Sequence, residues 1–112
     1  MNPVRHFFVA TCLLAAGLWA GEHNTLSKAE KAAGWQLLFD GKNINTHWRN
    51  IGQKEVTGKG WVIQDGVLIK EEGKAAGNIL TRRTWKDYEF AWEWKIGTKG
   101  NNGVKYMVLE KR

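Results

Sequence analysis

Cysteine and proline are almost absent from this chain. The single cysteine, Cys12, lies inside an apolar run near the N-terminus. A disulfide framework and a cysteine-based metal site are therefore excluded from the remainder. The single proline is Pro3, so no proline interrupts a strand further along. Beyond the apolar run the histidines are His23 and His47, and neither has a partner at metal-ligand spacing.

The chain also lacks an apolar run long enough to cross a bilayer. Its longest run, Phe7 to Ala20, is shorter than the roughly 20 residues that a spanning helix needs. Arg5 precedes it and polar residues follow, which is typical of a secretory signal peptide. We predict a leader over residues 1–20, cleaved after Gly17 or Ala20, and a secreted or periplasmic protein without a stable membrane anchor after cleavage. An uncleaved anchor and a lipid attached at Cys12 are the alternatives.

Basic residues exceed acidic ones only slightly. The formal charge is +6, and loss of the leader removes Arg5 alone, which leaves +5. Arg82-Arg83 and Lys111-Arg112 are the only basic pairs, and no helix aligns them along a groove. Nucleic-acid binding is therefore not expected.

A short helix or linker should follow the leader, within residues 21–33. Leu26 to Ala33 contains helix-forming residues, with Ser27 placed as an N-cap and Glu30 three residues later, as in a capping box. Gly34 ends this segment. No chemical role is expected for it.

From Trp35 onward, short apolar or alternating runs are separated by glycines and polar turns. Asp65-Gly66 lies between two such runs and predicts a tight hairpin. A second cluster of turn residues spans Lys99 to Gly103. We expect an all-β, antiparallel arrangement. The predicted strands are Trp35–Phe39, Trp48 with Arg49, Gly60–Ile63, Gly66–Ile69, Ile79–Thr81, Tyr88–Ile96 and Gly103–Leu109.

The clearest two-residue period lies in Tyr88 to Lys95. Tyr88, Phe90, Trp92 and Trp94 share one face of this predicted strand, and Glu89, Ala91, Glu93 and Lys95 share the other. Alternating aromatic residues are more often the packed interior between two sheets than a surface on which sugars stack. We therefore predict that the aromatic face is core. The opposite face is then either solvent-exposed or the floor of a binding cleft.

Four segments in order resemble one family. GWQLLFDGKNINTHWR, WVIQDGVLI, ILTRRTWKDYEFAWEWKI and GNNGVKYMV are similar to the 3-keto-disaccharide hydrolase domain family, over Gly34 to Leu109. The resemblance implies an exported bacterial protein with a concanavalin-like jelly-roll β-sandwich, here over residues 34–112. Domains of that family are longer, so we expect an incomplete N-terminal part of one.

The resemblance also implies a reaction on glycosides oxidised at C3. The ketone acidifies the C2 hydrogen, a general base removes it, the enediolate expels the C1 leaving group, and water then adds. Glu93 stands where the family has an acidic residue facing the cleft, which implies an acid/base or hydroxyl-binding role. A solvated glutamate paired with Lys95 is the alternative.

Further substrate contacts follow from the resemblance. Asn101 and Asn102 match the family's Asn-Ser-Gly turn, and Asn102, in the serine position, still donates and accepts hydrogen bonds. Met107 stands where many members have arginine, so Lys105, two residues away on the same face, is the candidate replacement. Thr81 and Trp48 are weaker candidates for substrate binding, as is Lys95.

No cofactor is evident and no metal site is predicted. A divalent metal stays open, because jelly rolls can hold calcium with groups such as Asp40, Asp65 and backbone carbonyls. The expected partner is a carbohydrate.

Three functions of different classes remain open. The first is an exported enzyme that cleaves 3-keto-glycosides. The second is a non-catalytic carbohydrate-binding jelly roll. The third is an inactive, truncated fragment, whose unpaired strand edges and exposed aromatic residues would favour aggregation.

Overall fold

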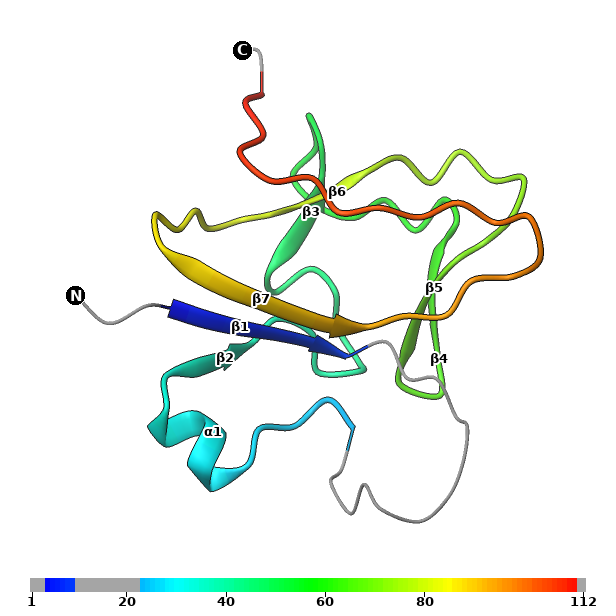
Figure 1. Cartoon of the computed structure of the whole chain (residues 1–112). Coiled ribbons are helices and arrows are strands. Elements are labelled where there is room, and N and C mark those ends of the chain that lie inside the picture. Colours follow the sequence, from blue (N-terminus) through cyan, green and yellow to red (C-terminus); the bar gives the residue numbers. More distant parts are fainter. Residues whose placement is uncertain (1–3, 10–22, 111–112) are drawn as a thin grey trace.

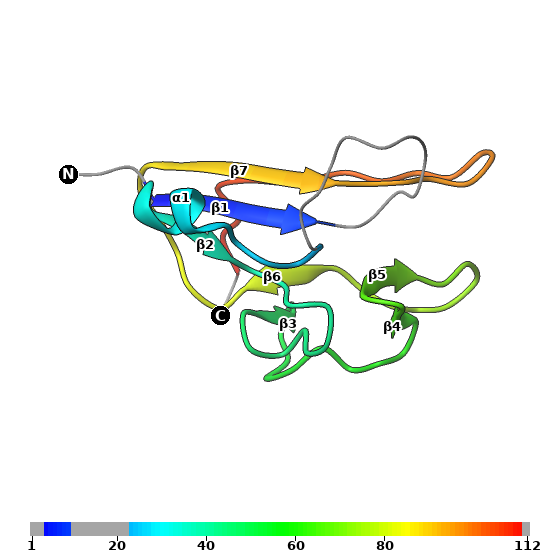
Figure 2. The same ribbon diagram turned by 90° about the horizontal axis from the view of Figure 1, so that it is seen from below.

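A computed structural model describes residues 4–9 and 23–110 of the chain. Strands dominate these residues and only one short helix accompanies them (Figure 1), so the prediction of an all-β fold is confirmed. Figure 2 shows two layers: β1, β2 and β7 form one, and β3, β4, β5 and β6 lie below it. No helix in the described ranges is long and apolar enough to cross a membrane.

The helix α1 spans Lys28–Ala32, inside the segment that the sequence predicts. The Ser27 hydroxyl accepts a hydrogen bond from the Glu30 N–H at 3.1 Å, and the Ser27 N–H donates to the Glu30 carboxylate at 2.7 Å. These two bonds satisfy N–H groups that the first turn leaves without helical partners. Gly34 follows at φ +88°, a conformation that glycine adopts without a steric cost. The predicted capping box is therefore confirmed.

Six of the predicted strands are present, with bounds that match or differ by one to three residues at an end. They are β2 (Trp35–Leu37), β3 (Trp48–Asn50), β4 (Trp61–Gln64), β5 (Val67–Lys70), β6 (Ile79–Thr81) and β7 (Tyr88–Glu93). The predicted strand Gly103–Leu109 is wrong, since this segment is not a strand in the structure. Met107 has φ +54°, which interrupts an extended backbone, and no neighbouring strand supplies hydrogen bonds there.

The hairpin between β4 and β5 forms as predicted. Its strands pair antiparallel, with Gln64 opposite Val67, so Asp65 and Gly66 alone make the turn. Both have positive φ, +51° and +75°, as a type I′ turn requires. The second antiparallel pair joins β3 to β6, with Trp48 opposite Thr81.

The remaining sheet departs from the antiparallel prediction. Its order is β2-β1-β7, where β1 is Val4–Val9, and β1 pairs parallel with both neighbours. Residues 4–9 lie inside the predicted leader, and their sequence, with Arg5 and His6 side by side, has no two-residue period and gave no strand signal. The leader itself stays a prediction, as do its cleavage positions and the domain boundary at residue 34.

The buried core lies mainly in the loops and strands of the lower layer. Phe39, Ile44, Val56 and Leu68 form one cluster, against which half-buried side chains pack. These are Trp48, Trp61, Ile63 and Ile79. The prediction that the aromatic face of β7 is core is wrong: Tyr88 and Trp94 are 44% and 54% exposed, and no β7 residue joins the cluster. Phe90 and Trp92 instead stack on each other, with ring centroids 5.0 Å apart.

Asn50, at the end of β3, connects three segments of the lower layer. It is 5% exposed, and its side-chain amide donates to the carbonyls of Ala76 and Asn78 at 2.9 and 3.1 Å. Its side-chain oxygen accepts from the Thr57 N–H at 2.8 Å. Because all three partners are backbone groups, the side chain replaces ladder hydrogen bonds that two irregular loops cannot make for themselves.

Substituting Asn50→Ala should destabilise the lower layer strongly. Three hydrogen bonds are lost and the carbonyl of the buried Ala76 stays without a partner, for which we expect a decrease of about 2–4 kcal/mol in the free energy of unfolding. Urea unfolding followed by tryptophan fluorescence measures this loss. Gln53→Ala, at an exposed position of the adjacent turn, is the matched control. Equal stability of the two variants would contradict the role assigned to Asn50.

Candidate functional site

Glu93 is the last residue of β7, and its side chain is exposed. Lys95 follows beyond the strand end and is also exposed. Sheet alternation places both side chains on the same face as long as the backbone remains extended. Among the described residues, neither makes a hydrogen bond or ion pair with the other candidate site residues.

Asn101, Asn102 and Lys105 belong to residues 94–109, which leave the end of β7 and return toward the lower layer (Figure 1). All three side chains are exposed. The Asn102 side-chain oxygen accepts a hydrogen bond from the Gly103 N–H at 2.7 Å, so it caps its own turn. These polar side chains are therefore accessible to solvent, and among the described residues no hydrogen bond or ion pair joins them to Glu93.

Thr81 and Trp48 lie together in the lower layer, as partners across β3 and β6. The Thr81 hydroxyl donates to the Arg83 carbonyl at 2.9 Å, and the Trp48 indole N–H donates to the Leu38 carbonyl at 2.9 Å. Trp48 also packs against the buried cluster. The structure thus groups the predicted site residues in three places: the end of β7, the exposed segment after it, and the β3-β6 pair.

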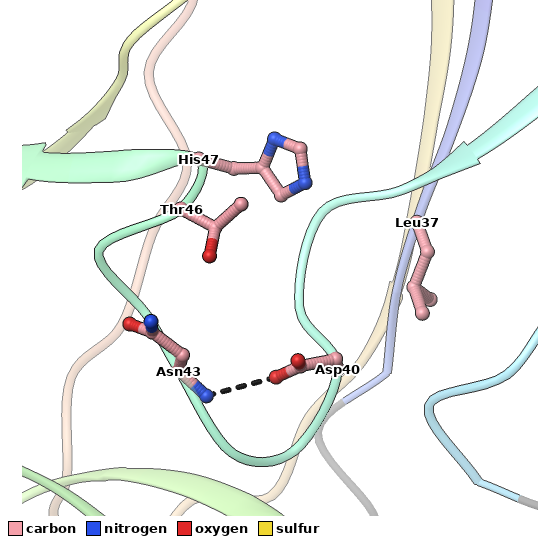
Figure 3. A pocket seen from close by; sticks show the side chains of 5 residues that line it. All are labelled: Leu37, Asp40, Asn43, Thr46 and His47. Carbon is pink, nitrogen blue, oxygen red and sulfur yellow. Dashed lines mark hydrogen bonds between the residues drawn. The ribbon is translucent and has the colours of Figure 1, made fainter.

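A separate polar hollow lies in the loop between β2 and β3. Leu37, Asp40, Asn43, Thr46 and His47 line it (Figure 3), and its volume is about 40 Å³. Ligand pockets commonly measure about 300–1,000 Å³, whereas about 10–15 Å³ is enough for one water. This hollow has room for a few waters and not for a sugar ring.

The Asp40 carboxylate organises this loop. One of its oxygens, Oδ1, accepts from the Lys42 and Asn43 N–H groups, both at 2.8 Å. These bonds stabilise the charged form, so the Asn43 N–H first, and then the Lys42 N–H, hold the pKa of Asp40 below its ordinary value. The Asn43 side-chain oxygen accepts in turn from the Asn45 N–H at 2.8 Å. Asp40 thereby fixes the turn that leads into β3.

This hollow was not predicted from the sequence. Asp40 precedes Gly41, and a polar run starts two residues after Asp40. This pattern is typical of a turn closed by the side chain of an aspartate or asparagine. For metal binding the hollow offers Asp40 and His47 as side chains of the usual ligand types. Within the described residues no group of three or more histidine, cysteine, aspartate or glutamate side chains is placed to hold a metal ion.

Replacing Asp40 should change how the free energy of unfolding depends on pH in the acid range. The pKa of Asp40 is lower in the folded chain than its ordinary value of 3.8 in the unfolded chain. The stabilisation that Asp40 contributes is therefore present above the unfolded pKa and is lost as pH falls through the folded pKa. Asp40→Ser, which keeps an acceptor but cannot ionise, should be less stable than the natural chain at pH 6, and the difference should shrink toward pH 2.5. Urea unfolding at several pH values measures it. A difference independent of pH would contradict this account.

Comparison with known proteins identifies relatives of this chain. Residues 34–112 match the model of the family described as the 3-keto-alpha-glucoside-1,2-lyase-like domain. A protein of Bacteroides thetaiotaomicron named 3-keto-disaccharide hydrolase is 34% identical over 101 residues, which cover 83% of this chain and 34% of that protein. The chain thus spans about a third of the length of this curated relative. No solved structure matches the chain.

The family match covers most of the chain and agrees with the relative, so the resemblance seen in the sequence is confirmed. The chain belongs to the 3-keto-alpha-glucoside-1,2-lyase-like domain family.

Proposed function

We propose that this chain takes part in the cleavage of 3-keto-glycosides, with 3-keto-disaccharides as the substrate class. The family match over residues 34–112 is the observation that carries the proposal, and the name of the relative supports it. Export through the predicted leader to the periplasm or the exterior is part of the same proposal. Carbohydrate is the proposed partner.

The chemistry needs a base next to C2 of the sugar. Glu93 supports this role because it is a carboxylate at a strand end, with its side chain accessible to a substrate and held by no described hydrogen bond or ion pair. It would take the C2 proton, the enediolate would release the group at C1, and addition of water would complete the cleavage. Lys95 and Lys105 are the proposed donors for the developing enediolate oxygen.

The other predicted residues would bind sugar hydroxyls. Asn101 and Asn102 have amides that both donate and accept, and both are exposed in the segment after β7. Thr81 and Trp48 are weaker candidates, because their polar atoms already bond to the Arg83 and Leu38 carbonyls. Trp48 keeps an aromatic face for stacking only where the buried cluster does not cover it.

Two other functions are distinguished from catalysis by direct measurement. A carbohydrate-binding module would bind a 3-keto-disaccharide and leave it intact. An inactive fragment would neither bind nor cleave it. The small size of the hollow at Asp40 argues against sugar binding in that hollow.

The test is an assay of the whole chain on a disaccharide oxidised at C3, with the unoxidised disaccharide as the control substrate. We expect cleavage of the oxidised sugar only, and loss of about 100-fold or more of the rate in Glu93→Gln, the range of a lost general base. Glu89→Gln, at another exposed glutamate of β7, is the matched control and should retain the rate.

Cleavage that survives in Glu93→Gln would remove Glu93 from the catalytic role. Binding without cleavage, measured by calorimetry on the natural chain, would replace the enzyme by the binding module.

A further inference from the structure

The sheet β2-β1-β7 is joined entirely through its middle strand. β1 pairs with β7 from Val4 opposite Tyr88 to Val9 opposite Glu93, and with β2 from Arg5 opposite Trp35 to Phe7 opposite Leu37. Both ladders are parallel, so β2 and β7 run in the same direction with one strand between them (Figure 1). We call the position between β2 and β7 the middle slot.

A parallel occupant of the middle slot is unusual for this fold. Parallel sheets are normally covered on both faces by helices, whereas the helix described here, α1, has five residues and contacts β2. Because β2 and β7 are parallel to each other, a strand of the opposite direction would form antiparallel ladders with both. Neither flanking strand would need to change direction.

The present occupant also belongs to the predicted leader. Cleavage after Gly17 or Ala20 would remove Val4–Val9 from the chain. The backbone N–H and C=O groups of β2 and β7 that face the middle slot would then lack partners, which an exposed sheet edge readily finds in another strand.

The chain contains a segment suited to replace it. Gly103–Leu109 carries the strand pattern described above yet pairs with no strand, and its Tyr106, Met107 and Leu109 side chains are 74%, 87% and 93% exposed. In Figure 1 it runs opposite to β7, on the side of β7 away from β1, and in Figure 2 it starts in the layer of β7 and ends nearer the lower layer. Val104, Tyr106 and Val108 would share one face of the strand, where the stacked rings of Phe90 and Trp92 offer an apolar surface.

We propose that Val4–Val9 and Gly103–Leu109 compete for the middle slot, so that removal of the leader transfers it to Gly103–Leu109 as an antiparallel strand. The loop between β7 and the new strand already contains tight-turn geometry, with Lys99 at φ +59° and a hydrogen bond from the Gly100 N–H to the Gly97 carbonyl at 2.9 Å. Strands that follow one another in sequence commonly pair in this way.

Two features oppose the exchange. Met107 would have to leave its φ of +54° for an extended conformation. The Glu110 carboxylate forms a two-bond ion pair with the Arg49 guanidinium, at 2.9 and 2.6 Å, which ties the end of the segment to β3. The same carboxylate accepts from the Gly52 N–H at 2.8 Å. The pair is about a quarter exposed, and its bidentate geometry is the kind that keeps a contribution at a surface. For the exchange to occur, pairing of the central strand and covering of its apolar face must outweigh these contacts.

The exchange would also assemble the candidate site. A hairpin of β7 with Gly103–Leu109 brings Asn101, Asn102 and Lys105 to the end of β7 that carries Glu93. This consequence rests on the proposed role of Glu93, whereas the strand exchange rests on the predicted leader and not on the reaction.

Cross-strand disulfide trapping in the whole chain tests the exchange. Gln36 lies in β2, opposite the same β1 residue as Phe90. Four variants are made, all with Cys12→Ser and Gln36→Cys. Each carries one second cysteine in place of Lys105, Tyr106, Met107 or Val108. A disulfide requires Cα atoms roughly 4.4–6.8 Å apart, so its formation reports that the segment has entered the middle slot.

Phe7→Pro displaces β1, because proline removes a backbone donor that a middle strand cannot spare. We expect an intramolecular disulfide at one or two of the four positions when Phe7→Pro is present and at none when it is absent. The chain from Gly21 to Arg112 should behave like the Phe7→Pro chain. Hydrogen exchange should find the β7 amides protected in both, and unprotected when Tyr106→Pro is added.

Absence of a disulfide at all four positions in the Phe7→Pro chain, with β7 amides exchanging freely, would overturn the proposal. A disulfide between two molecules would overturn it as well, because a second copy would then supply the strand. Neither readout involves a substrate, so a failed exchange and a failed assignment of Glu93 are told apart.

Discussion

The pairing of β2 and β7 through one strand is the constraint on which the upper layer depends. β7 carries Glu93 at its end and contributes nothing to the buried cluster, so its position relies on its ladder with β1 rather than on burial. The backbone hydrogen bonds of β7 form only when some segment supplies a partner strand. The candidate site at the end of β7 is therefore coupled to the occupancy of the middle slot.

The lower layer is held differently, by side chains that bond to backbone groups of its loops and turns. Asn50 joins β3 to residues 57, 76 and 78, and Asp40 closes the turn that leads from β2 toward β3. These contacts surround the cluster of Phe39, Ile44, Val56 and Leu68. The lower layer thus carries its own core and keeps Trp48 and Thr81 in fixed positions, whatever strand lies between β2 and β7.

Local features of the fold were predictable and long-range pairing was not. The capping box at Ser27 and the turn at Asp65-Gly66 each follow from a few adjacent residues, since the chemistry that determines them is contained there. Strand alternation in β7 gave the two faces correctly but not which face is covered. Which face is buried depends on residues distant in sequence, and Tyr88 is 44% exposed. The parallel strand Val4–Val9 had no sequence signal, because Arg5 and His6 stand side by side and Phe7, Phe8 and Val9 follow without the two-residue period of a strand.

The same distinction applies to the candidate site. The family and the identity of Glu93 as an exposed carboxylate could be reached from the sequence, because the motifs lie in four recognisable segments. The relative positions of Glu93, Asn101 and Lys105 could not be predicted, because they depend on a partner strand for Gly103–Leu109 that no local sequence pattern identifies. The Asp40 hollow was readable from its turn chemistry and carries no role in the proposed reaction.

The claim that β1 holds β7 in place is tested most directly by nuclear Overhauser contacts in the whole, isotope-labelled chain. The account predicts backbone contacts between Val4–Val9 and Tyr88–Glu93 in a parallel pattern, with Arg5 beside Glu89 and Phe7 beside Ala91. Absence of these contacts, or an antiparallel pattern between the two strands, would contradict it.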